Sequence, residues 1–208
     1  MKRGVLLLAV LLLAGCGAAK EEPGPAPFTP MKETVTTATT AAAAAPRGHY
    51  LTARRGGWLR VLASERPNGR AAWIRASLVR LDSTDYSIHV DRSARRLTLR
   101  HGRRAVGSFP VAVGRPGTET PTGRFAVTDK LHPDDPASPY GCCLLALSGH
   151  QTKLIKGWPG GDRLAIHATP SLWTVGKAAS LGCMRARPGD IRRLMRRVPA
   201  GTPVFVRA

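Results

Sequence analysis

Between residues 86 and 208 the chain is divided by glycine and proline into short apolar runs, and this division limits the fold more than any other feature. The runs recur roughly every ten residues, which is the spacing of strands in a sandwich or a small barrel. Strands are predicted over 86–90, 96–100, 106–113, 124–128, 144–148 and 164–167, with a last one at 204–206. The sequence therefore predicts a mainly β domain.

One helix interrupts this pattern after Pro188, a residue that suits the first turn of a helix because its missing N–H would have no partner there. Apolar side chains then recur at the spacing of one helical face, with arginines between them. These apolar residues are Ile191, Leu194, Met195 and Val198. We expect a short C-terminal amphipathic helix that ends before Gly201.

Residues 1–15 have the pattern of an export signal, because two basic residues precede an apolar run that stops at small residues. A membrane-spanning helix needs about 20 apolar residues, so this run is too short to remain as an anchor. The segment Leu13-Ala14-Gly15-Cys16 resembles the lipobox of bacterial lipoproteins, which implies a lipid on Cys16 and attachment to the cell membrane facing the wall. A plain signal peptide cut near Ala14 is the alternative, and both place the folded part outside the cytoplasm.

Two segments separate this signal from the β domain at 85–208. Residues 16–48 are rich in Ala, Thr, Pro and Glu without an amphipathic pattern, which predicts a disordered tether after Cys16. Residues 49–82 alternate in polarity around Pro67, Asn68 and Gly69, which indicates a β-hairpin. Because this segment is too small to bury a large core, we expect it to dock on the main domain or to form a partial SH3-like module.

The chain is strongly basic, with a formal net charge of +19. In a cytosolic protein this balance would suggest nucleic acid, but the export signal and an aromatic content of 5% oppose that function. An exported cationic protein meets anionic lipid headgroups and acidic cell-wall polymers instead. Since the arginines are scattered along the chain, we expect a generally cationic surface and not a focused groove.

The adjacent Cys142 and Cys143 favour core or strand positions, because neighbouring cysteines rarely bond to each other. A structural disulfide stays open for an exported protein. No Cys-x-x-Cys spacing is present, and Cys183, His167 and His150 lack the spacing of zinc ligands. We therefore expect neither a metal nor a cofactor.

The residues that could carry out a reaction lie late in the chain, where His167 ends a predicted strand and Cys183 follows a glycine. Each of the two alone is as typical of a buried core as of a site. Together they suit acyl transfer, since an imidazole that accepts the thiol proton, with the Arg185 charge nearby, favours the thiolate. Gly182 leaves the surrounding backbone amides open to an oxyanion, and a backbone carbonyl is expected to orient His167.

The stretch Ser180-Leu181-Gly182-Cys183-Met184-Arg185, with His167 upstream, resembles the signature of the L,D-transpeptidase (YkuD-like) catalytic domain. Blocks at 111–114, 120–125 and 140–141 resemble the same family, so the resemblance covers nearly all of 86–208. It implies a β-sandwich or barrel in which Cys183 is the nucleophile, His167 the general base and proton donor, and the Ala168 carbonyl the group that orients the imidazole. The segment 49–82 resembles the short β module before many actinobacterial members.

Further positions follow from the same resemblance. Ser180, Gly182 and Arg185 match fixed positions of the motif, and Arg185 is implied in binding the substrate carboxylate or in supporting the loop. Apart from the resemblance, His132, His150 and Tyr140 are candidates to border the cleft, and Tyr140 and His150 are also candidates to contact substrate. The loop 158–162, just before the His167 strand, is a candidate lid. The chain departs from the motif at Leu181, where the family usually has His, and at Ala168, where it usually has Gly or Ser.

The resemblance implies a two-step exchange on peptidoglycan stem peptides, without metal or nucleotide. A thioester on Cys183 would release D-Ala and then be resolved by the side-chain amine of another stem, giving a 3→3 cross-link. Water as acceptor would make an L,D-carboxypeptidase, and a protein amine would make a protein-to-wall ligase. A degenerate site that only binds peptidoglycan is a further alternative, and we expect a monomer.

Overall fold

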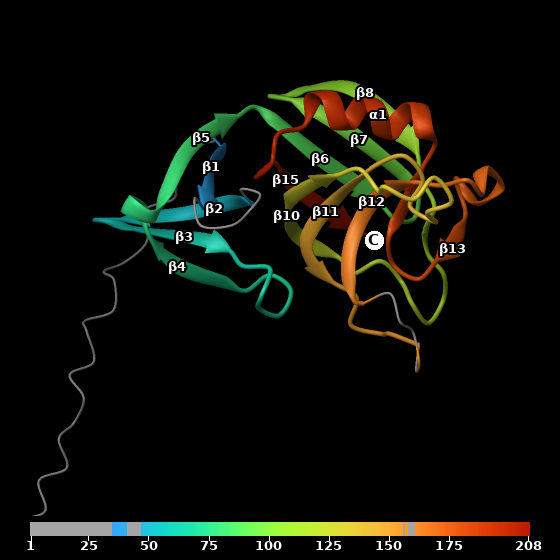
Figure 1. Cartoon of the computed structure of the whole chain (residues 1–208), viewed down its shortest axis with the longest axis horizontal. Coiled ribbons are helices and arrows are strands. Elements are labelled where there is room, and N and C mark those ends of the chain that lie inside the picture. Colours follow the sequence, from blue (N-terminus) through green and yellow to red (C-terminus); the bar gives the residue numbers. More distant parts are fainter. Residues whose placement is uncertain (1–34, 41–46, 156, 158–160) are drawn as a thin grey trace, which may run out of the picture.

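Two β-sheets lie side by side in the protein (Figure 1). The computed structural model describes residues 35–40, 47–155, 157 and 161–208, with the backbone alone for 35–40. A five-stranded N-terminal sheet spans 35–84, and a C-terminal domain over 85–208 is built on an eight-stranded sheet. The C-terminal domain also carries the helix α1 (Pro188–Arg197).

The eight-stranded sheet has the order β14-β12-β11-β10-β15-β6-β7-β8. Its strands are β6 (Tyr86–Asp91), β7 (Arg96–His101), β8 (Arg104–Pro110), β10 (Gly123–Leu131), β11 (Leu144–His150), β12 (Arg163–Ala168), β14 (Met184–Ala186) and β15 (Pro203–Arg207). Neighbouring strands are antiparallel except for two parallel pairs, β12 with β14 and β15 with β6. Two short strands, β9 (Val113–Gly114) and β13 (Ala178–Ser180), pair separately, and a 3₁₀ turn covers Leu172–Thr174.

The core of this domain follows from the alternation of its strands, because every second residue of a strand faces the same side. Ile88 and Val90 of β6 and Leu97 and Leu99 of β7 are all buried in one continuous cluster. The helix α1 adds its apolar stripe to the cluster through Ile191, Leu194 and Met195, with Val198 just beyond its end. The predicted helix and the mainly β class are both confirmed.

The N-terminal sheet has the order β4-β3-β2-β1-β5 and is antiparallel throughout. Its strands are β1 (Val35–Thr40), β2 (Gly48–Arg55), β3 (Trp58–Leu62), β4 (Ala71–Arg75) and β5 (Val79–Thr84), with a 3₁₀ turn at Ala76–Leu78. The predicted hairpin is confirmed, since β3 and β4 pair from Trp58 with Arg75 to Leu62 with Ala71. Its connecting loop, residues 63–70, is called the hairpin loop below. The SH3-like description stays a prediction.

This sheet has little core of its own and packs against the C-terminal domain. Only Leu51, Leu59 and Val61 form its buried cluster among the described side chains. Strand β2 lies against β10, and Gly48 approaches the turn after α1 so closely that an added Cβ would stand 2.1 Å from the Gly201 nitrogen. Docking on the main domain is therefore what the structure shows.

Two expectations about segment boundaries are wrong. The strand predicted over 106–113 is divided, because β8 ends at Pro110, which has no N–H to donate, and Val113 pairs with β13 instead. The disordered tether predicted over 16–48 does not hold for Val35–Thr40, which forms β1 between β2 and β5. A strand in that place satisfies backbone groups of both neighbours, a long-range gain that local composition does not reveal. Cys16 and the rest of the predicted signal and tether before residue 35 lie outside the described residues.

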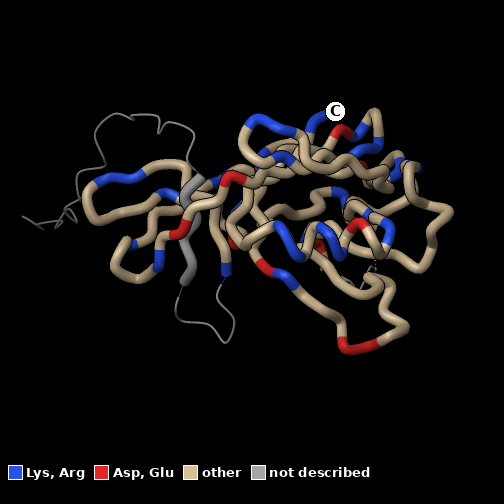
Figure 2. Tube along the Cα trace, turned by 90° about the horizontal axis from the view of Figure 1, so that it is seen from above, with Lys and Arg blue, Asp and Glu red and all other residues tan. Residues whose placement is uncertain are grey.

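The adjacent cysteines precede β11 and carry no disulfide. Cys143 is buried in the core and Cys142 packs against it, so their expected core position is confirmed. Lysine and arginine are spread over both sheets (Figure 2), as expected from their scatter in the sequence. Over the part of the chain that the structure describes, helices are too short or too polar to cross a bilayer.

Candidate active site

The parallel pairing of β12 with β14 brings the two motif residues to one face of the sheet. His167 lies opposite Arg185 in the register, and the fully buried Ile166 lies opposite Met184. Since side chains alternate along a strand, Cys183, two residues before Arg185, shares the face of Arg185 and His167. Strand β14 was not predicted from the sequence, yet it is the element that places the thiol.

His167, Cys183 and Arg185 line one narrow cleft of about 90 Å³. Tyr140 borders it with its ring edge-on to the His167 ring, at 5.0 Å between centroids. No carboxylate of the described chain pairs with the Arg185 side chain, although it lies half-buried at this cleft. The cleft therefore combines a thiol, an imidazole and an available positive charge.

His167 is held in one tautomer. Its Nδ1 lies 2.5 Å from the Ala168 carbonyl, and since a carbonyl only accepts, Nδ1 carries the proton and Nε2 a lone pair. The side chain is only 4% exposed, and burial lowers the pKa of His167 to about 4, helped by the Arg185 charge and opposed by the bond to Ala168. The ring is thus neutral at physiological pH and ready to accept a proton at Nε2.

Cys183 is a protonated thiol at rest. Burial raises the pKa of its thiol, and the backbone at Ala165 and the Arg185 charge only partly offset this. Its Sγ lies 3.8 Å from the Arg163 carbonyl, and no hydrogen bond to the His167 ring is formed among the described residues. The Arg185 charge lowers the pKa of the Cys183 thiol, as expected, but burial outweighs it and the net pKa is raised.

The Ser180 side chain stabilises the loop from Ser180 to Cys183 through two hydrogen bonds. Ser180, 1% exposed, donates from Oγ to the Cys183 carbonyl at 2.6 Å and accepts from the Gly182 N–H at 3.1 Å. Gly182 has a φ of 124°, which favours glycine. The Gly182 amide is thus engaged, whereas the Cys183 N–H makes no hydrogen bond within the described chain.

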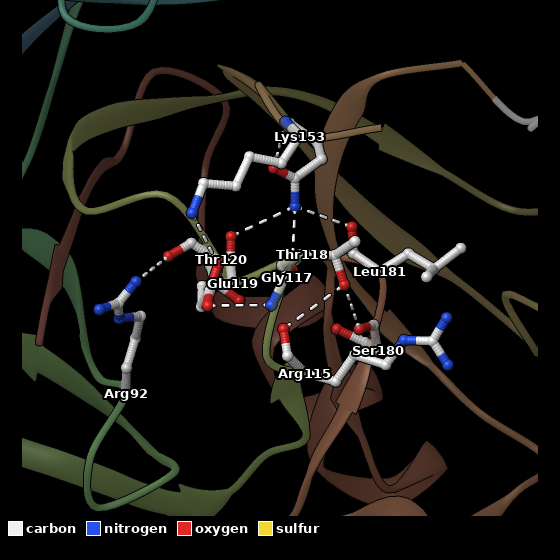
Figure 3. A network of polar contacts seen from close by, with 10 residues as sticks. Arg92, Arg115, Gly117, Thr118, Glu119, Thr120, Lys153, Ser180 and Leu181 are labelled. Carbon is white, nitrogen blue, oxygen red and sulfur yellow. Dashed lines mark hydrogen bonds and ion pairs between the residues drawn. The ribbon is translucent and has the colours of Figure 1, made fainter. Parts of the chain in front are cut away.

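Three residues missed by sequence reasoning hold the carbonyls of this loop. Figure 3 shows Thr118 beside Ser180, with the Leu181 carbonyl in the same network. Thr118 donates to the Ser180 carbonyl, Thr120 to the Gly182 carbonyl at 2.8 Å, and Gln151 to the Leu181 carbonyl at 2.9 Å. Thr120 belongs to a block that resembles the family, which was a usable signal. Gln151 had no local signal, because its partners lie about 30 positions away in the sequence.

Other candidates are placed differently. His150 does not line the cleft, because its ring is bound between Asp162 and the Ser64 carbonyl of the hairpin loop. His132 is exposed. Asp162, at the end of the suggested lid, does line the cleft, whereas residues 158–160 are outside the described part. No group of three or more His, Cys, Asp or Glu side chains that could hold a metal occurs among the described residues.

Comparison with known proteins agrees with this fold. Residues 85–206 match the sequence model of the L,D-transpeptidase catalytic domain, YkuD. Because that match covers more than half of the chain, the protein belongs to the L,D-transpeptidase catalytic domain family. The resemblance seen in the sequence is confirmed.

Two bacilli carry similar proteins, both named as the L,D-transpeptidase YkuD. The one from Bacillus subtilis is 34% identical over 121 residues, which cover 58% of this chain and 65% of that protein. The one from Bacillus licheniformis is 33% identical over 125 residues, covering 60% of this chain and 67% of that protein. This chain thus spans about two thirds of the length of these relatives.

The fold is also that of L,D-transpeptidase 3 from Mycobacterium tuberculosis, solved with a faropenem-derived adduct. The TM-score is 0.50 at 17% sequence identity, over 85% of this chain and 81% of the mycobacterial one. This likeness concerns the fold, and it supports a mainly β L,D-transpeptidase architecture.

Proposed function

We propose that this protein is a peptidoglycan L,D-transpeptidase that forms 3→3 cross-links through a thioester on Cys183. The observation that carries the proposal is the neutral imidazole of His167 and the protonated thiol of Cys183 on one face of β12 and β14, at a single cleft. A neutral base beside a protonated nucleophile is the resting state of general-base acyl transfer.

In the first step the Cys183 Sγ attacks the carbonyl at the L-centre of a donor tetrapeptide, and its proton moves to Nε2 of His167. The carbonyl π electrons move to oxygen, and the Cys183 N–H is placed to donate to that oxyanion. When the intermediate collapses, the C–N bond to D-Ala breaks and the leaving amine takes the proton from Nε2. A thioester and free D-Ala result.

In the second step the side-chain amine of a diamino acid on another stem attacks the thioester. Nε2 of His167 removes a proton from this amine, the C–S bond breaks, and the thiolate of Cys183 takes the proton back. The energy comes from the peptide bond that was broken, so the exchange uses no nucleotide. Throughout, the Ala168 carbonyl stabilises the protonated imidazole through Nδ1.

Substrate contacts are proposed for Arg185 and Tyr140. The Arg185 guanidinium has no carboxylate partner in the described chain and is suited to a stem-peptide carboxylate. Tyr140 fixes the His167 ring from the side and adds a hydroxyl to the cleft. Ser180 acts on the loop and not on the substrate, since both polar contacts of its Oγ are to the loop backbone.

The test is incubation of the full chain with disaccharide tetrapeptides, followed by mass spectrometry, with Cys183→Ala as control. A dimer that has lost one D-Ala supports the transpeptidase. A tripeptide monomer would identify an L,D-carboxypeptidase, and attachment of the stem to a protein amine would identify a ligase. No turnover with retained peptidoglycan binding would identify a binding protein and overturn the proposal.

A β-lactam gives a second test of the same thiol. The faropenem-derived adduct of the mycobacterial L,D-transpeptidase 3 suggests penems and carbapenems as probes for this chain. We expect one adduct on the peptide that contains Cys183 and none in Cys183→Ala. Absence of an adduct from the wild type would count against an acyl-accepting Cys183.

We further propose that Cys16 is lipidated and that the protein acts as a monomer, outside the cytoplasm and facing the cell wall, without binding nucleic acid. The support is the pattern of residues 1–16. Metabolic labelling with a fatty-acid analogue should label the wild type and not Cys16→Ser, and Cys16→Ser should leave the membrane fraction. Size-exclusion chromatography with light scattering tests the monomer.

A further inference from the structure

The hairpin loop of the N-terminal sheet forms hydrogen bonds with the end of β11. The Asn68 side chain accepts from the His150 N–H and donates to the His150 carbonyl, both at 2.7 Å. The two contacts imitate the pairing of a neighbouring strand and fix the backbone at this position. The contact joins residues 82 positions apart and links the two sheets.

The ring of His150 strengthens the same link. Nδ1 lies 2.9 Å from the Asp162 carboxylate and Nε2 contacts the Ser64 carbonyl, so both nitrogens face acceptors and the ring suits the doubly protonated form. Burial alone would lower the pKa of His150, but the bonds to Asp162 and to Ser64 outweigh it and raise the pKa. Asp162 in turn lines the cleft of Cys183.

The next residue, Gln151, connects these contacts to the loop from Ser180 to Cys183. Its backbone N–H donates to the Asp162 carbonyl at 2.6 Å, and its side chain is buried, with the whole residue only 6% exposed. The two N–H groups of Nε2 are shared among three acceptors, the carbonyls of Leu181 at 2.9 Å, Thr118 at 3.0 Å and Glu119 at 3.2 Å, and Oε1 accepts from the Lys153 N–H. Both polar atoms of this side chain are therefore engaged by the surrounding backbone.

Gln151 also lies directly against Gly182. A Cβ added to Gly182 would stand 2.3 Å from Nε2 of Gln151, so the two groups are in close contact. With Gln151 on the Leu181 carbonyl and Thr120 on the Gly182 carbonyl, two consecutive peptides are fixed. In a trans peptide the N–H points opposite to the C=O, so the bond of the Gly182 carbonyl to buried Thr120 turns the Cys183 N–H the other way.

We propose that Gln151 positions the Cys183 N–H indirectly, by fixing the Leu181–Gly182 peptide next to the one that Thr120 holds, and that the hairpin loop of the N-terminal sheet holds Gln151 in place through His150. This inference rests on the proposed acyl transfer at Cys183. The N-terminal sheet thereby acts in the reaction without touching the substrate.

The test compares two reactions of Cys183 in the full chain. Acylation by a carbapenem needs an oxyanion donor, whereas alkylation by iodoacetamide needs a reachable thiolate but no oxyanion donor. Both are read by mass spectrometry on the peptide that holds Cys183, so that Cys142 does not interfere. We expect Gln151→Glu, which removes the amide donor at nearly the same size, to lower the acylation rate about 100-fold and to leave alkylation unchanged.

Asn68→Ala keeps the test valid if the buried substitution disturbs folding. Asn68→Ala should also lower the acylation rate, by about 2-fold to 30-fold. In the Gln151→Glu background it should have no additional effect, since both act through one link. Matched controls are Arg66→Ala, which removes an exposed side chain of the same hairpin loop, and Lys153→Ala, which breaks only the exposed pair with Glu119. Both controls should acylate like the wild type.

Hydrogen exchange separates this proposal from the proposed function. If the wild type is not acylated, the acyl-transfer proposal fails, and the loop is then read from amide exchange over 181–184, which needs no reaction. Gln151→Glu and Asn68→Ala should accelerate that exchange, and the two controls should not. Unchanged exchange and acylation in Gln151→Glu, or full additivity of Asn68→Ala with it, would overturn the proposal.

Discussion

The two sheets of this protein differ in how they are stabilised. The C-terminal domain encloses a continuous apolar core to which the strands of its eight-stranded sheet and α1 all contribute. The N-terminal sheet buries only Leu51, Leu59 and Val61 in its own cluster and leaves Trp58 41% exposed and Trp73 37% exposed. Since so small a cluster supplies little stability, the N-terminal sheet depends on its docked side, where β2 meets β10 and Asn68 holds His150.

The largest effect is expected on the reaction rate, when the proposed general base of the C-terminal domain is replaced. His167→Gln keeps a polar side chain of similar reach but removes the proton acceptor, so kcat/KM for cross-linking should fall by about 10²-fold to 10⁴-fold. Steady-state kinetics by mass spectrometry measures this, and thermal unfolding should show the domain still folded. A loss no greater than that of Asn68→Ala would mean that the chemistry does not depend on this histidine.

A core substitution should separate the two sheets in stability. Leu59 is fully buried in the N-terminal sheet, and Leu59→Ala should lower the stability of that sheet by about 2–5 kcal/mol. Hydrogen exchange should then become fast over 48–84 and stay slow in the core strands of 86–206. The control is Leu78→Ala, a residue 64% exposed, which should stay within about 0.5 kcal/mol of the wild type. A single cooperative loss of both sheets would show that they fold as one unit.

Acid should weaken the C-terminal domain through His167. Its pKa is about 4 in the folded domain and 6.5 ordinarily, so as the pH falls through this window the unfolded chain takes up a proton that the folded domain refuses. The free energy of unfolding should fall by about 3 kcal/mol from this group, at about 1.4 kcal/mol per pKa unit. Denaturation of the wild type and of His167→Gln over this range isolates the effect, and equal slopes would contradict it.

Acid should act oppositely at the junction of the sheets, and this is the smallest effect expected. Because the bonds to Asp162 and Ser64 raise the pKa of His150, the folded state holds its proton more tightly than the unfolded chain. The contribution of His150 is fully present below about pH 6.5 and is lost as the pH rises through its folded pKa. The stability difference between wild type and His150→Gln should therefore shrink as the pH is raised from about 6.5 through the folded pKa of His150. A difference that grows over this range would contradict the protonated ring.

Much of the C-terminal domain could be predicted because its signals are local. Alternating apolar residues indicated most strands, and the spacing of Ile191, Leu194 and Met195 indicated α1. The spacing of His167 and Cys183 within a family motif indicated the site. Strand β14 was missed because it is three residues long and exists through its pairing with β12.

The N-terminal part was predicted less well, for the same physical reason. The hairpin of β3 and β4 has a turn signal in its sequence, whereas β1 does not and becomes a strand because β2 and β5 flank it. His150 was assigned to the substrate because a histidine near a cleft suggests one. Its ring is occupied by partners from a hairpin loop that sequence spacing could not place beside it.

The sequence by itself determined which residues have the necessary chemistry: a thiol after Gly182, an imidazole at a strand end, and an arginine two positions beyond the thiol. Only the tertiary structure decided their protonation states and the direction of the Cys183 N–H. Those properties depend on burial and on contacts with Thr120 and Gln151, which are distant in sequence. Desolvation and long-range hydrogen bonds are absent until the chain folds, so no local pattern can encode them.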